Sequence, residues 1–112
     1  MDEVSLSGPT RVIEWTGQRI VEYEIEPQML GLPRRAAAEV AGGGPRENAE
    51  LIRQVLGGAS GAHRDIVLLN AALALKICGA TKSLNEGFRR AADSIDSGAA
   101  QRKLASLVES ER

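Results

Sequence analysis

The stretch IVLLNAALALKIC, residues 66–78, is the longest apolar run in this chain of 112 residues. It is too short to span a bilayer and is interrupted by Asn70 and Lys76, so we interpret it as part of a buried helix over residues 62–78. A helix that is apolar on nearly every side has to be enclosed by other elements. The amide of Asn70 needs hydrogen-bond partners in such surroundings, and we expect it to tie the helix to a neighbouring backbone.

Further helical patterns lie on both sides of this run. Apolar residues recur at helical spacing, and most of the patterns end at a glycine, which is typical of helix C-termini. Ser83 and Glu86 have the spacing of a capping box at the start of one of these helices. The sequence predicts four to five helices in all: a short segment at 36–40, then residues 46–56, 62–78, 84–97 and 99–109.

Strands precede these helices. Val4 and Leu6 alternate with polar residues over residues 3–7, which is the pattern of a half-buried strand. The stretch RVIEWTGQRIVEYEIE, residues 11–26, predicts an antiparallel hairpin with its turn at Thr16-Gly17-Gln18 and one solvated face. Each strand has a shared apolar face, with the glutamates of the second strand pointing away from it: Ile13 and Trp15 on the first strand, and Val21, Tyr23 and Ile25 on the second.

Strands over residues 3–25 followed by helices over residues 46–109 indicate the α/β class, or an α+β arrangement when these residues are taken alone. The apolar character of helix 62–78 and the outer edge of strand 3–7 suggest surfaces that need cover from outside this chain. We therefore expect the chain alone to expose apolar surface.

The composition is that of a globular protein, with 43% apolar and 26% charged residues. Fourteen Lys and Arg nearly balance fifteen Asp and Glu without forming a basic block, which argues against a nucleic-acid partner or a membrane surface. The single Cys78 cannot form an internal disulfide, and no charged apolar leader is present. Both observations predict a cytoplasmic location.

Asp2 and Glu3 are the candidate metal ligands. Carboxylate oxygens are hard ligands of the kind that Mg²⁺ prefers, and adjacent residues can share one ion at the end of a strand. The alternative is an ordinary solvated terminus, which the two residues by themselves favour. Structural roles are also favoured for the other candidates: a helix start for His63, a core position for Cys78 and solvent exposure for the Arg34-Arg35 pair.

The order of motifs resembles the carboxy-terminal part of the anthranilate phosphoribosyltransferase family, over essentially the whole chain from Asp2 to about Val108. The resemblance would cover roughly the last third of a full-length member. The segments that carry it are D-E-V-S-L-S-G-P-T-R-V (2–12), E-P-Q-M-L-G-L-P-R (26–34), N-A-E-L-I-R-Q-V-L-G-G (48–58), R-D-I-V-L-L-N-A-A-L-A-L (64–75) and S-L-N-E-G-F with A-A-D-S-I-D-S-G-A-A (83–100).

The resemblance implies a function. Members of the family transfer the phosphoribosyl group of phosphoribosyl pyrophosphate to anthranilate in tryptophan biosynthesis. Their α/β domain is of the nucleoside-phosphorylase type and belongs to glycosyltransferase family 3. Residues 1–112 would be the C-terminal part of that domain, with Asp2 and Glu3 corresponding to the acidic pair that holds Mg²⁺ near the pyrophosphate. Bound Mg²⁺ stabilises the charge that develops on the departing pyrophosphate.

Other parts of the family have no counterpart in this sequence. These are the Gly-Thr-Gly-Gly-Asp phosphate loop, the Lys-His-Gly-Asn-Arg loop, and the N-terminal helical domain that forms the homodimer interface. No residue of this chain is therefore predicted to be catalytic, and none is assigned to substrate binding. We expect the chain to be inactive alone and to act with a missing N-terminal segment, as a truncated or split enzyme. The alternative is a non-catalytic remnant or interaction module.

Overall fold

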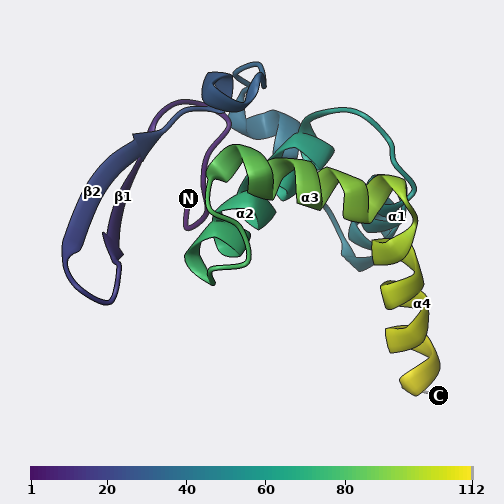
Figure 1. Cartoon of the computed structure of the whole chain (residues 1–112). Helices are drawn as coiled ribbons and strands as arrows, with labels where there is room; N and C mark the ends of the chain where they lie inside the picture. The colour runs from purple at the N-terminus through teal and green to yellow at the C-terminus, as the bar shows by residue number, and fades with distance from the viewer. Residues whose placement is uncertain (112) are drawn as a thin grey trace.

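The computed structural model describes residues 1–111 and shows a β-hairpin followed by four α-helices (Figure 1). The hairpin extends away from the helices, α2 and α3 lie together in the centre, and α4 projects from the opposite end (Figure 1). The predicted hairpin and helices are confirmed. In chain order the elements are β1 (Thr10–Trp15), β2 (Ile20–Ile25), the short 3-10 helices η1 (Pro27–Leu30) and η2 (Ala37–Val40), α1 (Pro45–Leu56), α2 (Ala62–Ile77), α3 (Leu84–Asp96) and α4 (Ala99–Ser110).

The hairpin is antiparallel, and its turn is closed by a hydrogen bond from the Thr16 N–H to the Arg19 carbonyl (3.0 Å). Gly17 has a φ of 94°, a conformation that favours glycine. Ile13 and Trp15 do share a face, but it is the solvated one, with 63% and 65% of these residues exposed. The cause is the register, because Ile13 lies opposite Glu22 and cross-strand partners share a face.

The strand predicted at residues 3–7 is not present as a strand within residues 1–111. Its alternation is nevertheless real, because Val4 and Leu6 are buried and Glu3 and Ser7 are exposed. Among residues 1–111 the sheet consists of β1 and β2, so the segment packs against the hairpin through its side chains and forms no backbone ladder with it. The Val4 N–H and carbonyl and the Ser5 N–H bond instead to side chains, and the Leu6 carbonyl accepts from a loop amide.

Two hydrophobic clusters lie on either side of α2. The first, which we call the hairpin-side cluster, joins the N-terminal segment and the hairpin to α2, and its buried members are Val4, Leu6, Ile25 and Leu69. The second, which we call the helix-side cluster, joins α1, α2 and α3, and its buried members are Val55, Leu68, Ala91 and Ile95. The adjacent residues Leu68 and Leu69 therefore contribute to different clusters.

The central helices approach each other closely at a glycine. A Cβ added to Gly87 in α3 would lie 2.6 Å from the carbonyl oxygen of Ala72 in α2, closer than any real side chain approaches. The start of α3 is capped by Ser83, whose Oγ accepts from the Glu86 N–H (3.1 Å). The Glu86 carboxylate returns to the Lys82 N–H (3.1 Å), one residue before the position that the capping box predicts. Among residues 1–111, no helix has the length and apolarity needed to cross a membrane.

Candidate functional site

The candidate metal ligands Asp2 and Glu3 lie at the start of the chain, which Figure 1 places near α2. The next residue, Val4, is hydrogen-bonded to Asn70 in the middle of that helix. Both residues are exposed. They are followed at once by the buried Val4, so the pair stands at the point where the chain leaves solvent and enters the hairpin-side cluster.

Side chains hold the backbone that follows the pair. The Asn70 Oδ1 of α2 accepts from the Val4 N–H (2.9 Å), and the Asn70 Nδ2 donates to the Val4 carbonyl (3.1 Å). The Ser5 N–H donates to the Thr10 Oγ1 (3.0 Å) and the Arg35 N–H to the Leu6 carbonyl (2.9 Å). The expectation that Asn70 ties helix 62–78 to a neighbouring backbone is therefore confirmed.

The donor set at this point consists of two carboxylates. Within residues 1–111 neither Asp2 nor Glu3 forms an ion pair, and no group of three or more His, Cys, Asp or Glu side chains could enclose a metal ion. Mg²⁺ is commonly held by one or two carboxylates together with substrate phosphates and water. Two exposed carboxylates that form no ion pair fit that habit, and a cage built by this chain alone is not present within residues 1–111.

The other predicted positions have mainly structural surroundings. His63 lies in the first turn of α2, as expected for a helix start. Cys78 follows the last residue of α2 and is exposed, so its predicted core position is wrong. Arg34 pairs with Glu26 (3.2 Å), and Arg35 bridges to Asp65 of α2 (3.0 Å) with its side chain only 28% exposed. Only one member of the arginine pair is thus largely solvated.

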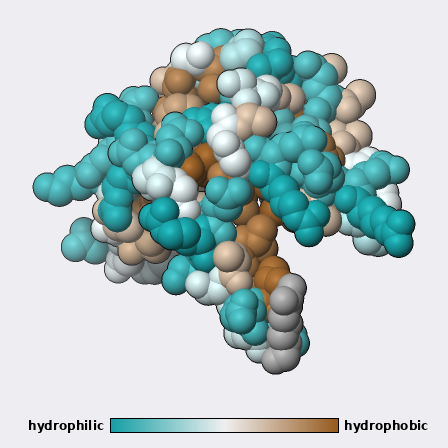
Figure 2. Space-filling model, turned by 90° about the vertical axis from the view of Figure 1, so that its right-hand side faces the viewer, coloured by the Kyte–Doolittle hydropathy of each residue, from teal (hydrophilic) through white to brown (hydrophobic). Residues whose placement is uncertain are grey.

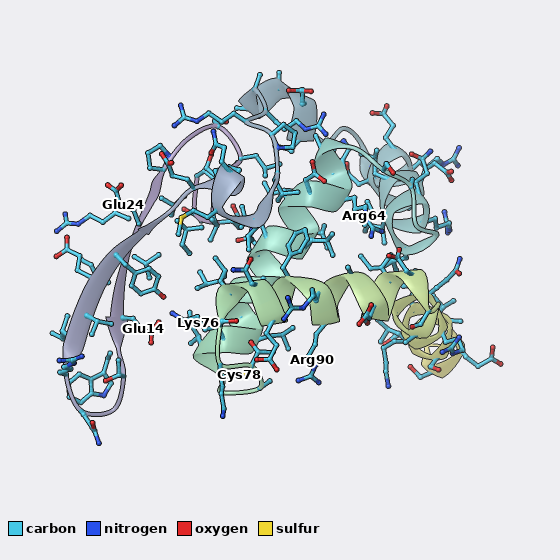
Figure 3. The ribbon with its side chains drawn as sticks, turned by 45° about the horizontal axis from the view of Figure 1, so that its top comes forward. Glu14, Glu24, Arg64, Lys76, Cys78 and Arg90 are labelled. Atoms are coloured by element: carbon cyan, nitrogen blue, oxygen red, sulfur yellow. The ribbon has the colours of Figure 1, made fainter. Side chains whose placement is uncertain are left out.

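A polar cluster that the sequence patterns did not predict joins the hairpin to α2. Tyr23 donates from its hydroxyl to the Glu14 Oε1 (2.7 Å) and accepts from the Lys76 Nζ (3.1 Å). The Lys76 Nζ also lies 3.7 Å from Glu14 and 4.3 Å from the centre of the Tyr23 ring. Figure 3 shows Glu14 and Lys76 facing each other between the hairpin and α2. The sequence feature that could have indicated this cluster is Lys76, a charged residue inside an apolar run that needs polar partners.

Burial and hydrogen bonding shift the pKa values of this cluster. Burial and the hydrogen bond to Glu14 raise the pKa of Tyr23, outweighing the opposite effect of Lys76. Burial tends to lower the pKa of Lys76, but the hydrogen bond and charge interactions with Tyr23 and Glu14 outweigh it and raise the pKa. At neutral pH the cluster therefore contains a neutral phenol beside a paired lysine and carboxylate. It can anchor the hairpin, but it holds no activated nucleophile.

Open apolar grooves mark the helical end of the molecule. One of about 470 Å³ lies between α2, α3 and the start of α4, and its lining includes Val67, Leu75 and Ile95. Another of about 390 Å³ lies between α1 and α4, and includes Leu104 and Val108. Figure 2 shows hydrophobic surface running along the projecting α4. The first groove is lined mainly by apolar side chains and offers packing surface, whereas Arg53, Gln101 and Glu109 also line the second.

Comparison with known sequences identifies the family. Residues 1–101 match the model of the family described as "Glycosyl transferase family, a/b domain". The chain belongs to this glycosyl transferase family. It is 50% identical over 108 residues to anthranilate phosphoribosyltransferase of Anaeromyxobacter sp. (strain K), a match that covers 96% of this chain and 32% of that protein. The anthranilate phosphoribosyltransferase of Hyphomonas neptunium is 46% identical over 112 residues, a match that covers 100% of this chain and 33% of that protein. The chain spans about a third of the length of these curated relatives.

Solved structures of glycosyl transferase family members have the same fold over this region. Anthranilate phosphoribosyltransferase from Thermus thermophilus matches with a TM-score of 0.88 at 37% identity, over 97% of this chain and 32% of that one. The enzyme from Saccharomyces cerevisiae in complex with PRPP and Mg matches with a TM-score of 0.86 at 31% identity, over 98% and 32%. The hairpin and the four helices are thus the arrangement found in these enzymes.

Proposed function

We propose that this chain is the carboxy-terminal segment of an anthranilate phosphoribosyltransferase, which transfers the phosphoribosyl group of phosphoribosyl pyrophosphate to anthranilate in tryptophan biosynthesis. The observation that carries the proposal is the 50% identity to relatives of that name over nearly the whole chain. The Saccharomyces cerevisiae structures in complex with PRPP and Mg, and with 4-fluoroanthranilate, support these substrates.

The proposal assigns residues 1–112 to the C-terminal part of the α/β domain, acting together with a segment that supplies the remaining two thirds of the relatives' length. Without that segment the chain is inactive. A cytoplasmic location remains a prediction from the sequence.

Within this function Asp2 and Glu3 are the Mg²⁺ ligands. Their support is the unpaired, exposed state of both carboxylates and the anchored backbone that follows them. Bound Mg²⁺ supplies positive charge against the departing pyrophosphate. The chain contributes the two carboxylates, next to a backbone segment that Asn70 holds against α2. The hairpin and helices supply the rigid base on which such a site depends.

The test is reconstitution. The chain is mixed with the complementary two thirds of the Anaeromyxobacter sp. (strain K) enzyme, expressed as a separate polypeptide, and formation of phosphoribosyl anthranilate is measured. We expect activity in the mixture and none from either piece. In a mixture made with the Asp2→Asn, Glu3→Gln chain, we expect a loss of at least about hundredfold, because several kcal/mol of charge stabilisation are removed.

Glu24→Gln is the matched control, since it removes one carboxylate from the exposed outer face of the hairpin, away from the helices (Figure 3). Its mixture should be as active as the unmodified one. An inactive mixture of two folded pieces would instead favour a non-catalytic remnant or interaction module. Full activity of the mixture made with the double variant would show that Asp2 and Glu3 are not needed as Mg²⁺ ligands. It would not contradict the proposed transferase activity.

The chain alone should bind Mg²⁺ no more tightly than about millimolar, because two carboxylates without substrate phosphates complete only a small part of the octahedral shell. Isothermal titration of the chain with MgCl₂ measures this directly. Micromolar binding that disappears in Asp2→Asn would show that the chain forms a complete site by itself.

A further inference from the structure

Asn70 occupies an unusual position in the middle of α2. Its neighbours in the helix include Leu68, Leu69 and Ala72, all of which are buried. A polar amide lowers the apolar character of this surface and needs partners of its own. Two of its three hydrogen bonds reach the backbone of Val4, 66 residues away in sequence.

The carboxamide of Asn70 contacts both backbone polar groups of one residue, Val4. The Oδ1 accepts from the Val4 N–H at 2.9 Å, and the Nδ2 donates to the Val4 carbonyl at 3.1 Å. The Nδ2 donates a second time, to the Ile66 carbonyl of the preceding helical turn at 3.0 Å. Rotating the amide by half a turn would set its oxygen against two carbonyls and its NH₂ against an N–H. The side chain is therefore fixed in one orientation.

This contact is the last anchor before the acidic pair. Thr10 and Arg35 hold Ser5 and Leu6, which lie farther along the chain. Within residues 1–111, no hydrogen bond to another part of the chain involves residues 1–3. If the Asn70 contact were absent, the buried side chain of Val4 would still hold this residue in the hairpin-side cluster, but no hydrogen bond would fix the direction of its backbone. The positions of the Asp2 and Glu3 carboxylates would then be set less strictly.

We infer that Asn70 is a positioning residue for the metal-binding pair: by clamping Val4 to α2 it fixes where the Asp2 and Glu3 carboxylates stand. This inference rests on the proposed role of those two residues as Mg²⁺ ligands. Asn70 does not touch the ion. It acts through the backbone, and an asparagine is required because the Val4 peptide groups need an acceptor and a donor on one short planar side chain.

The test uses the full chain, labelled for NMR, with Mn²⁺ as a paramagnetic probe. Mn²⁺ takes the same carboxylate and water ligands as Mg²⁺ and broadens the resonances of nearby nuclei. The variants are Asn70→Leu, which keeps the approximate shape and removes all three hydrogen bonds, and Asn70→Asp, which keeps one acceptor and removes both donated bonds. Ser83→Ala is the matched control, because it weakens the α3 cap without touching this region.

Two results are expected. The Val4 amide should exchange with solvent at least about tenfold faster in Asn70→Leu than in the unmodified chain, after correction for global stability with Ser83→Ala. Mn²⁺ should broaden residues 2–4 and the Ile66–Leu73 part of α2 in the unmodified chain. In Asn70→Leu the broadening of residues 2–4 should remain, while that of α2 is lost. If Asn70→Leu does not fold, the Val4 amide exchange and the Mn²⁺ broadening are measured in Asn70→Asp, with the same changes expected.

Unchanged Val4 exchange, or α2 broadening that survives the loss of the amide, would overturn the positioning role. Absence of broadening at residues 2–4 in the unmodified chain would instead count against the metal role of Asp2 and Glu3. The exchange of Val4 would still decide whether the clamp exists, so failure of one hypothesis is distinguishable from failure of the other.

Discussion

On one side of α2 the N-terminal segment and the hairpin are joined to the helix by directional polar contacts. Asp65, Asn70 and Lys76 of α2 each bond to this half of the molecule, through Arg35, Val4 and the Tyr23–Glu14 pair. On the other side, α2 meets α1 and α3 mainly through apolar packing and through the close approach at Gly87.

The difference shows two ways of fixing position. Hydrogen bonds have preferred distances and angles, so they fix the positions of particular atoms. This suits a segment that has to present metal ligands. Close packing fixes the position of whole helices but specifies individual atoms less strictly, because similar volumes can be repacked at modest cost. The polar side of α2 is therefore the side suited to chemistry, and the apolar side serves as its support.

The largest expected effects come from the two adjacent leucines. Leu68→Ala and Leu69→Ala remove side chains that are 2% and 0% exposed, and each should lower the free energy of unfolding by about 3 kcal/mol. Hydrogen exchange should rise most in β1 and β2 for Leu69→Ala, and most in α1 and α3 for Leu68→Ala. If both variants raised exchange equally everywhere, the two sides would form a single cooperative unit and the comparison would fail.

The next effect concerns the close contact of the helical side. Gly87→Ala should destabilise the chain by about 2 kcal/mol in chemical denaturation, because the new methyl meets the backbone oxygen of Ala72, which cannot turn away as a side chain could. Gly8→Ala is the control, since an added Cβ there meets nothing within 4 Å. Equal stability of the two variants would show that α3 can shift away from α2, and that the packing between these helices is loose.

A smaller effect is expected on the polar side. Tyr23→Phe removes the hydroxyl that links Glu14 to Lys76 and should cost about 1 kcal/mol in unfolding free energy. The raised pKa values of Tyr23 and Lys76 mean that their contribution is complete below the unfolded values near pH 10 and is lost as the pH rises through the folded values. The unmodified chain should thus lose stability more steeply than Tyr23→Phe above about pH 10. If the two curves of stability against pH were parallel, the cluster would not contribute to the docking of the hairpin on α2.

The smallest effect tests the two-point ion pair between α2 and α3. Arg64 donates to both carboxylate oxygens of Asp96 (2.8 and 2.9 Å), and this hydrogen bonding lowers the pKa of Asp96. The contribution is present above the unfolded aspartate value near 4 and is lost as the pH falls through the lower folded value. Asp96 is largely solvated, so Asp96→Asn should change the acid branch of the stability curve only slightly. A large change would mean that the helical side also depends on a polar contact.

The helices and the hairpin could be predicted because their signals are local. Glycines end the helical patterns, Ser83 starts one, and alternation flanks the turn at Gly17. The amide of Asn70 was predictable for a similar reason, since a buried polar group has to be satisfied.

What sequence reasoning missed depends on pairing between segments. The hairpin register sets Trp15 opposite Ile20, so odd-numbered residues of β1 share a face with even-numbered residues of β2. The apolar stripes of the two strands consequently lie on opposite faces, which neither stripe reveals alone. The segment 3–7 has strand-like alternation, but a ladder needs a hydrogen-bonded backbone partner, and within residues 1–111 no strand pairs with it. The partners of Lys76 come from 53 and 62 residues away, beyond any local pattern.

The exposed face of the hairpin has an optical consequence. Trp15 is the only tryptophan of the chain and lies outside both hydrophobic clusters. Its indole should emit at the long wavelength of a solvated ring whether or not the core is intact, so intrinsic fluorescence is nearly silent during unfolding. The same silence makes it a clean reporter of anything that covers the hairpin, because a blue shift on mixing with another polypeptide would come from this one surface.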